Sequence, residues 1–319
     1  RDINAANTRY IQVTNNVVKQ IKAKDVRRFV REWSEERCLN ENVRNLIVNS
    51  MKFSETSLEN LKEVELDFSN FTHNTQLFFF PNNNVEVTPK EIIVHQRGDT
   101  AFNHYVWEEN VLKHNFKPLP DMFKLTCLDK ENNLYDIDVL DCKSSPIFGY
   151  VINTSRLHWR KEMEERFEDN PEEAKAYAEK HRFCINGEGL TEDEIREQKQ
   201  NLANKIFAIG YMLHRFKSPS RAWAPQAMDN KIGENGECNG RSGKSFLFKT
   251  LSLFMKSVKL SGRNPKLMDN PHVFDQVNVH TDFVLVDDCA QYLSMGLFYD
   301  IITSDMTINP KNNQSYSIP

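Results

Sequence analysis

The chain has 319 residues, of which 39% are hydrophobic and 27% are charged, and its formal net charge is −4. This composition is typical of a folded protein with a sizeable core, and no apolar run approaches the roughly 20 residues that a membrane-spanning helix requires. The small negative charge argues against a protein that coats duplex DNA, but it is compatible with one that grips a single strand in a locally basic channel.

The six cysteines are scattered and lack metal-ligand spacing, which is typical of free thiols in a reducing cytoplasm. We therefore expect a cytoplasmic protein. The chain begins with Arg1 and has no signal-peptide pattern, so we expect it to be an internal piece of a longer protein.

The first region, residues 1–74, is predicted to be helical. In "DVRRFVREW" (25–33) apolar residues recur at helical spacing, and "NVRNLIVNSM" (42–51) repeats the pattern. Both patterns favour amphipathic helices whose apolar face packs in a core. The basic residues beside the first pattern favour a solvated face over a nucleic-acid contact.

The second region, residues 75–154, is predicted to be a small β-containing element. "TQLFFFPNNNVEVTPKEIIVHQ" (75–96) contains short β-rich runs separated by turn residues, and "NLYDIDVL" (133–140) alternates as a strand does. The phenylalanines at 78–80 are compatible with a base-stacking platform. A buried strand is the favoured interpretation.

The third region, residues 155–218, is predicted to return to helix and to form a collar or linker. Thr191 and Glu194 have the spacing of a capping box, in which the two residues satisfy each other's backbone N–H groups. A stripe of apolar residues follows at helical spacing and comprises Leu202, Ile206, Ile209 and Leu213.

The fourth region, residues 219–319, has an α/β pattern. "RAWAPQAM" (221–228) is interpreted as a strand, and a glycine-rich loop leads into the predicted helix "FLFKTLSLFMKSV" (246–258). "TDFVLVDDC" (281–289) is a continuous apolar run, which is typical of a strand buried in a parallel sheet.

Gly243-Lys244-Ser245 has the form of the end of a phosphate-binding loop, although Cys238 stands where the pattern requires its first glycine. Successive backbone N–H groups and a helix N-terminus bind phosphate well. In such a loop the lysine contacts the β- and γ-phosphates of ATP, and the serine hydroxyl binds Mg²⁺. The strand–loop–helix context favours a nucleotide site over a chance match.

Asp287 and Asp288 follow the apolar run at its C-terminal end. In an open α/β sheet this end of a strand is where ligands bind. We expect the carboxylate of Asp287 to position Mg²⁺ and that of Asp288 to orient or deprotonate the attacking water. An exposed pair of aspartates without a function is the alternative interpretation.

At these residues the chain resembles superfamily 3 helicases, specifically the primase–helicases of phage and poxvirus type. The resemblance is carried by three stretches: "GYMLHRFKSPSRAWAPQAMDNKIGENGECNGRSGKSF", "VHTDFVLVDDC" and "LFYDIITSDMTINPKNNQSYSIP". It covers roughly residues 205–319. It implies an α/β P-loop NTPase core of AAA+-like type at the C-terminus, preceded by a mainly helical region with a small β element.

The resemblance also implies the residues of an ATP and Mg²⁺ site. The catalytic group would comprise Lys244, Asp287 and Asp288, with Ser245 and Asp287 on the metal. The ATP-binding loop would comprise Asn239, Gly240, Arg241, Ser242, Gly243, Lys244, Ser245 and Phe246. Lys311 falls on the position of a DNA-contacting lysine in a pore hairpin, here 305–316, although a solvated turn lysine is the alternative.

Members of this family form homo-oligomeric rings, usually hexamers, that thread single-stranded DNA through a central channel, and their primase domain lies upstream in the same polypeptide. Their sensor residue and arginine finger would lie beyond Pro319. Because an arginine finger contributes about 10³–10⁵ in rate, we expect this chain alone to bind ATP but to hydrolyse it poorly; a version extended past 319 that turns over ATP equally fast would contradict this.

Three other functions remain open at this point. The first is an ATPase switch of a mobile element or defence system that uses ATP for assembly. A small-molecule kinase is the second, but it would need an acceptor pocket and an arginine-rich lid. The third is a catalytically silent scaffold, for which Cys238 is the only support.

Overall fold

The computed structural model describes residues 9–59, 61–167, 169–218, 220–228, 243–264, 267, 269–289, 293, 295–311 and 313–318. The chain divides into two compact units, Arg1–Lys117 and Pro118–Pro319, and we describe each by itself. The expected boundaries near 74, 154 and 218 therefore fall inside units rather than between them.

The first unit begins with a β-hairpin. Strands β1 (Ile11–Thr14) and β2 (Val17–Gln20) are antiparallel and are joined by Asn15 and Asn16, whose φ angles are +48° and +69°. Positive φ at both central residues is the signature of a type I′ turn, which asparagine tolerates. The short strand β6 (Val106–Trp107) pairs with β2 in parallel. The prediction that the N-terminal region is helical throughout is thus wrong for residues 11–20.

Helices α1 (Ala23–Glu36) and α2 (Glu41–Val48) follow the hairpin, with the short turns η1 (Met51–Phe53) and α3 (Glu55–Leu58) after them. Both predicted helices are confirmed, but their apolar faces are not buried as a core face would be. Phe29 is 49% exposed and Leu46 is 75% exposed. These two helices pack mainly on each other, so one side of each apolar face has no covering element within the described part of the first unit.

The small β element is confirmed. Strands β3 (Gln76–Phe79), β4 (Asn83–Val87) and β5 (Ile92–Gln96) form an antiparallel sheet in that order, and the turn η2 (Glu108–Asn110) follows β6. Phe79 is 4% exposed and packs with Leu77, Phe102 and Val106. The phenylalanine run is therefore a strand whose middle part faces a core, as favoured from the sequence.

The second unit starts with the hairpin β7 (Phe123–Asp129) and β8 (Leu134–Val139), of which β8 is the predicted strand. Three helices follow, α4 (Pro146–Asn153), α5 (Pro171–Lys180) and α6 (Glu192–Leu213), with one π-helical turn, η3 (Arg160–Glu164), after α4. Ile137, Ile152 and Leu202 are fully buried at the centre of this packing. The capping box of Thr191 and Glu194 at the start of α6 is confirmed.

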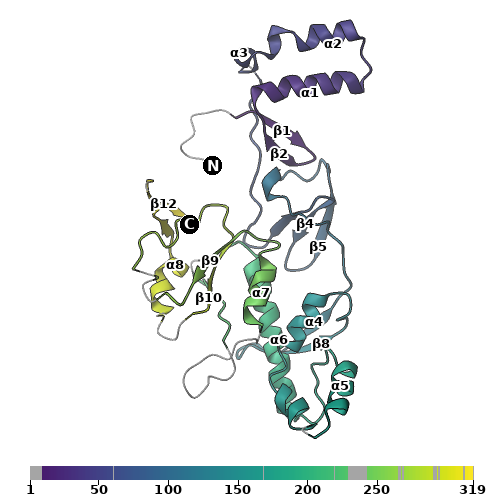
Figure 1. Cartoon of the computed structure of the whole chain (residues 1–319), viewed down its shortest axis with the longest axis vertical. Coiled ribbons are helices and arrows are strands. Elements are labelled where there is room, and N and C mark those ends of the chain that lie inside the picture. Colours follow the sequence, from purple (N-terminus) through teal and green to yellow (C-terminus); the bar gives the residue numbers. More distant parts are fainter. Residues whose placement is uncertain are drawn as a thin grey trace. The chain divides into compact units, whose positions relative to one another are not determined.

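The remainder of the second unit holds the α/β pattern. Its elements are α7 (Lys244–Leu251), β9 (Ser257–Ser261), β10 (Phe283–Asp287), η4 (Met295–Phe298), α8 (Tyr299–Thr303), β11 (Met306–Ile308) and β12 (Tyr316–Ile318). Strands β9 and β10 are parallel and lie side by side (Figure 1). The strand predicted from "TDFVLVDDC" is confirmed as β10.

Two predictions in this part of the chain are wrong. Residues 220–228 form no strand: Pro225 has no N–H to donate, and the N–H of Trp223 donates instead to the Tyr211 hydroxyl at 3.0 Å. The helix expected over 246–258 ends at Leu251, and residues 257–261 form β9. Val258 and Leu260 of β9 pack on a core while Ser257, Lys259 and Ser261 are exposed, so apolar residues recur in this stretch with a period of two.

Candidate nucleotide-binding site

Gly243 stands directly before α7, as the helix N-cap, with a left-handed φ of +81°. L-residues with a side chain rarely adopt this conformation, whereas glycine does so freely. Space also requires glycine, since a Cβ at this position would lie 1.8 Å from the hydroxyl oxygen of Tyr150. Both the backbone conformation and the close approach of Tyr150 therefore favour glycine at position 243.

Tyr150 of α4 contacts the start of α7. Its hydroxyl donates a hydrogen bond of 2.6 Å to the carbonyl oxygen of Gly243, and its ring meets the ring of Phe246 edge to face at 4.7 Å. Burial raises the pKa of Tyr150, so the hydroxyl keeps the proton that it donates. Tyr150 was not predicted as a site residue, because nothing in the sequence joins α4 to a loop about ninety residues later.

The decisive contact joins the start of α7 to the end of β10. The hydroxyl of Ser245 donates a hydrogen bond of 2.9 Å to Oδ1 of Asp287. The two residues are 42 positions apart in the chain. Their juxtaposition was expected from the two motifs, and the structure brings them together.

Lys259 of β9 binds the other oxygen of the same carboxylate. Its Nζ lies 2.6 Å from Oδ2 of Asp287. The hydrogen bond from Lys259, and after it the one from Ser245, lowers the pKa of Asp287, although partial burial acts in the opposite direction. Asp287 is therefore ionised at neutral pH. Lys259 was missed at the sequence level because the helix predicted over 246–258 overlaps the start of β9, and no strand was predicted there.

Asp288 directly follows β10, and its backbone has a left-handed φ of +59°. Arg263 holds this carboxylate with two nitrogens: Nε lies 2.5 Å from Oδ2 and Nη2 lies 3.3 Å from Oδ1. Bidentate contact favours one plane of the carboxylate, although both side chains are largely exposed, so the pair restrains Asp288 rather than fixing it. Arg263 was also missed in the sequence.

Gly262 brings the turn after β9 against the end of β10. Its N–H donates to the carbonyl oxygen of Asp287 at 2.8 Å, and a Cβ at this glycine would lie 2.6 Å from the Cα of Cys289. Only a residue without a side chain allows this approach. The segment that carries Arg263 is therefore fastened to the segment that carries both aspartates.

The other predicted residues have varied positions. Lys244 is the first residue of α7 and is half-buried, and Phe246 is half exposed beside Tyr150. Lys311 is exposed in the turn between β11 and β12, an antiparallel hairpin that matches the expected hairpin 305–316. The expected loop residues Asn239, Gly240, Arg241 and Ser242 lie outside the described residues.

The hairpin that carries Lys311 shares a core with β9 and β10. Ile308 is fully buried against Phe274 and Val277, and side chains from both strands pack on the same cluster. The hydroxyl of Tyr316 donates to the carbonyl oxygen of Val277 at 2.7 Å. The hairpin is thus packed on the same small sheet that ends in the two aspartates.

The oxygen atoms of Ser245 and Asp287 fit Mg²⁺, which prefers oxygen ligands. Within the described residues, no group of three His, Cys, Asp or Glu side chains could hold a metal ion alone. Mg²⁺ is usually bound through one or two protein oxygens together with water and substrate phosphates. The donor set at the end of β10 therefore fits a metal that arrives with a nucleotide better than one held by the protein.

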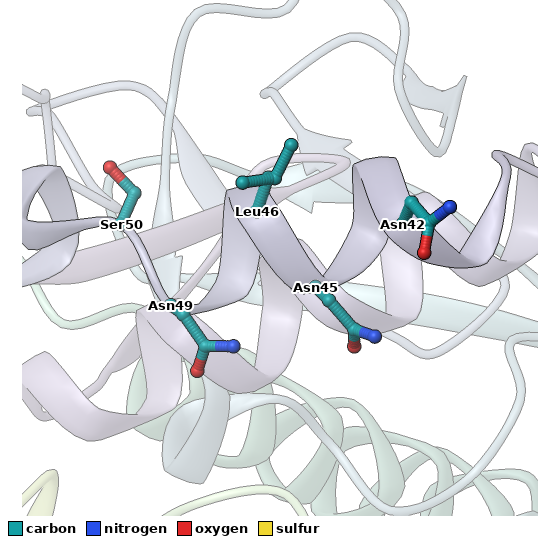
Figure 2. A pocket seen from close by; sticks show the side chains of 5 residues that line it. All are labelled: Asn42, Asn45, Leu46, Asn49 and Ser50. Atoms are coloured by element: carbon teal, nitrogen blue, oxygen red, sulfur yellow. The ribbon is translucent and has the colours of Figure 1, made fainter.

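A separate hollow lies on α2 in the first unit (Figure 2). It is lined by Asn42, Asn45, Leu46, Asn49 and Ser50, which come from one helix and the residues just after it. Asn45 and Asn49 point to the same side of the helix while Leu46 points away from them. With neutral amides and one leucine, the hollow offers no charged group for phosphate or metal.

None of the described helices combines the length and the apolar character needed to cross a membrane. Comparisons of the chain with protein-family models, with curated proteins and with solved structures find no match.

Proposed function

We propose that this chain is the ATP-dependent motor of a replicative DNA helicase of the primase–helicase type, with an α/β P-loop NTPase core, acting in the cytoplasm. The observation that carries the proposal is the 2.9 Å contact between Ser245 and Asp287. A serine that follows Gly-Lys at a helix start, hydrogen-bonded to an aspartate at the end of a parallel strand, is the arrangement that P-loop enzymes use for Mg²⁺ and ATP.

In the proposed reaction the backbone at Gly243 and the N-terminus of α7 hold the phosphates of ATP. The ammonium of Lys244 contacts the β- and γ-phosphates, and the oxygens of Ser245 and Asp287 hold Mg²⁺. When bound, Mg²⁺ neutralises charge that develops on the phosphates. Asp288, restrained by Arg263, orients the water that attacks the γ-phosphorus.

In this proposal the hairpin β11–β12 transmits the movement of the ATP site to DNA. The hairpin packs on the cluster that β9 and β10 also contact, so a shift of the strand ends after phosphate release displaces its base. Lys311, exposed in its turn, would contact a phosphate of single-stranded DNA. Six copies arranged as a ring would place six such lysines at one pore, which reconciles DNA binding with a net charge of −4.

The test is ATP turnover with and without single-stranded DNA, for a version of the chain extended past residue 319 and for its variants Lys244→Ala and Lys249→Ala, of which the second is the control. Lys249 is an exposed lysine in the last turn of α7. The proposal expects turnover that DNA stimulates, that Lys244→Ala abolishes and that Lys249→Ala retains. Turnover that depends on Lys244 but ignores DNA would favour the assembly switch, and the absence of turnover in all three proteins, or turnover that Lys244→Ala leaves unchanged, would refute the proposed site.

A further inference from the structure

Both oxygens of the Asp287 carboxylate are already occupied by groups of the protein itself. Oδ1 accepts a hydrogen bond from Ser245 at 2.9 Å, and Oδ2 lies 2.6 Å from the ammonium of Lys259. Because each carboxylate oxygen has two lone pairs, a metal that binds Asp287 either replaces one of these partners or shares an oxygen with it. Lys259 has no part in the ATPase mechanism proposed above, so its position on the metal side of the site requires its own explanation.

The strand register explains how Lys259 reaches this carboxylate. Asp287 is paired with Ser261 and Leu285 with Lys259, so Lys259 lies two residues before the partner of Asp287 on the parallel strand. Residues two apart share one face of a strand. That face of β9 is exposed, while Val258 and Leu260 on the other face pack on the core. The core therefore fixes Lys259 on the same side of the sheet as the acid.

The side chain of Asp287 is 17% exposed and that of Lys259 is 54% exposed. The acid is thus held in place, but the lysine retains access to water along its four-carbon stem and can move away. A divalent cation and an ammonium cannot bind one carboxylate oxygen together, because like charges at contact distance repel strongly. Even on the two different oxygens of Asp287 the two charges lie close enough to repel, so a metal ion on this carboxylate displaces the ammonium or binds more weakly beside it.

We infer that Lys259 is a positioning residue whose ammonium takes the place of the metal on Asp287 until a nucleotide brings Mg²⁺ with it. This inference rests on the proposed function. The free ion has to displace an ammonium or bind more weakly beside it, and it gains only one protein carboxylate in return. The nucleotide-bound ion arrives with phosphate oxygens that already coordinate it, and those phosphates offer the displaced ammonium a new partner. Metal and nucleotide consequently bind together rather than in sequence.

The experiment measures binding of Mn²⁺, as a probe for Mg²⁺, to the nucleotide-free chain by electron paramagnetic resonance of the free ion. The proteins compared are the wild type, Lys259→Met, Lys259→Arg and the control Lys249→Met, which removes the same charge from an exposed site on α7. Because Lys259 is half exposed, the expected gain in Mn²⁺ affinity for Lys259→Met is about three- to tenfold. Lys259→Arg and Lys249→Met should remain near the wild type.

Adding Asp287→Asn to Lys259→Met should remove the gained Mn²⁺ affinity, which locates the metal at this carboxylate. Circular dichroism confirms that each variant is folded, and methionine suits the half-exposed strand position. Equal Mn²⁺ affinity in the wild type and Lys259→Met, including no binding by either, would overturn the inference. ATP binding by the wild type and Lys244→Ala is measured separately. Its loss in Lys244→Ala, together with equal Mn²⁺ affinity in the wild type and Lys259→Met, would leave the proposed function intact and reject only the role of Lys259.

Discussion

The phenol of Tyr150 and the carbonyl of Gly243 are joined by a hydrogen bond of 2.6 Å, which links α4 to the residue that starts α7. The residue that starts α7 is thus supported by a helix that lies far earlier in the chain. Two consequences can be measured: the glycine should tolerate no side chain, and the damage should appear in nucleotide affinity as well as in stability.

We expect Gly243→Ala to destabilise the chain and to weaken ATP binding. A left-handed backbone costs alanine about 1–2 kcal/mol, and the added Cβ would lie 1.8 Å from the Tyr150 hydroxyl, so Tyr150 or the loop must move. Thermal unfolding measures the first effect and titration with a fluorescent ATP analogue measures the second.

Gly210→Ala is the matched control. Gly210 lies within α6, and a Cβ added there meets no atom within 4 Å. Because alanine is the better helix former, this variant should gain about 0.5–1 kcal/mol in stability and keep its ATP affinity. If both variants behaved alike, the constraint on Gly243 would be refuted.

Arg263→Ala should lower the rate of ATP hydrolysis and leave ATP affinity nearly unchanged. The two nitrogens of Arg263 restrain the Asp288 carboxylate, and a freely rotating carboxylate orients water less well. Since a positioned general base contributes about 10²–10⁴ to a rate, partial loss of its orientation should reduce kcat about tenfold.

Arg263→Lys tests whether the charge alone suffices. Lysine keeps the positive charge but lacks the bidentate fork, so it should restore only part of kcat. A loss of ATP affinity equal to the loss of kcat would instead assign Arg263 to nucleotide binding. To remove Asp288 itself, asparagine is preferable to alanine, because asparagine tolerates the φ of +59° at this residue.

The stability of the second unit should depend on Glu194 in acid. Hydrogen bonds from Lys161, and then from the Thr191 backbone, lower the pKa of Glu194 from 4.5 to about 2. A lowered folded-state pKa adds stability above pH 4.5, and this contribution is lost as the pH falls from 4.5 to about 2. The melting temperature of Glu194→Gln should therefore lie below that of the wild type at neutral pH and approach it across this window.

Glu192→Gln removes the same charge from the first turn of α6 without touching the capping box. It should lower the melting temperature less than Glu194→Gln at neutral pH. A difference between Glu194→Gln and the wild type that stayed constant down to pH 2 would show that Glu194 is not ionised against Lys161 and Thr191 as the contacts require.

Lys311→Ala should weaken binding to single-stranded DNA and leave ATP affinity intact. A lysine that neutralises one phosphate contributes about 0.7 to the slope of log affinity against log salt concentration for a single strand. The salt slope should therefore decrease in the variant. Lys175→Ala, on the exposed side of α5, is the control and should change neither quantity. An unchanged slope for Lys311→Ala would contradict a pore contact.

The elements that were predicted correctly are those whose hydrophobic or capping pattern is typical of the structure they form. The apolar run of β10 and the capping box of α6 were both confirmed. The hairpin β1–β2 was missed although Asn15-Asn16 between two β-branched pairs is a signal for a type I′ turn. The apolar residues of α1 and α2 did repeat at helical spacing, but spacing alone does not show that a face is covered.

The candidate site was predicted in its acids and its hydroxyl, because those residues belong to motifs with known spacing. The two basic residues that contact the acids, Lys259 and Arg263, and the aromatic support, Tyr150, were not predicted. Lys259 and Arg263 depend on β9, whose two-residue period is hidden behind the helical pattern of α7. Tyr150 depends on the packing of α4, which no local pattern can report. Contacts between residues so far apart in the sequence can be identified only once the fold is known.

The tight approach of Gly262 to Cys289 gives the strand end a property useful to the experimenter. Cys289 is an exposed thiol whose pKa is raised by burial and by the charges of Asp287 and Asp288. Since the thiolate is the reactive form, alkylation of Cys289 at neutral pH should be slow. Additional positive charge beside Asp287 and Asp288 would lower the pKa of Cys289 and increase its rate of alkylation. The alkylation rate of Cys289, the residue after Asp288, therefore reports the net charge around the two aspartates.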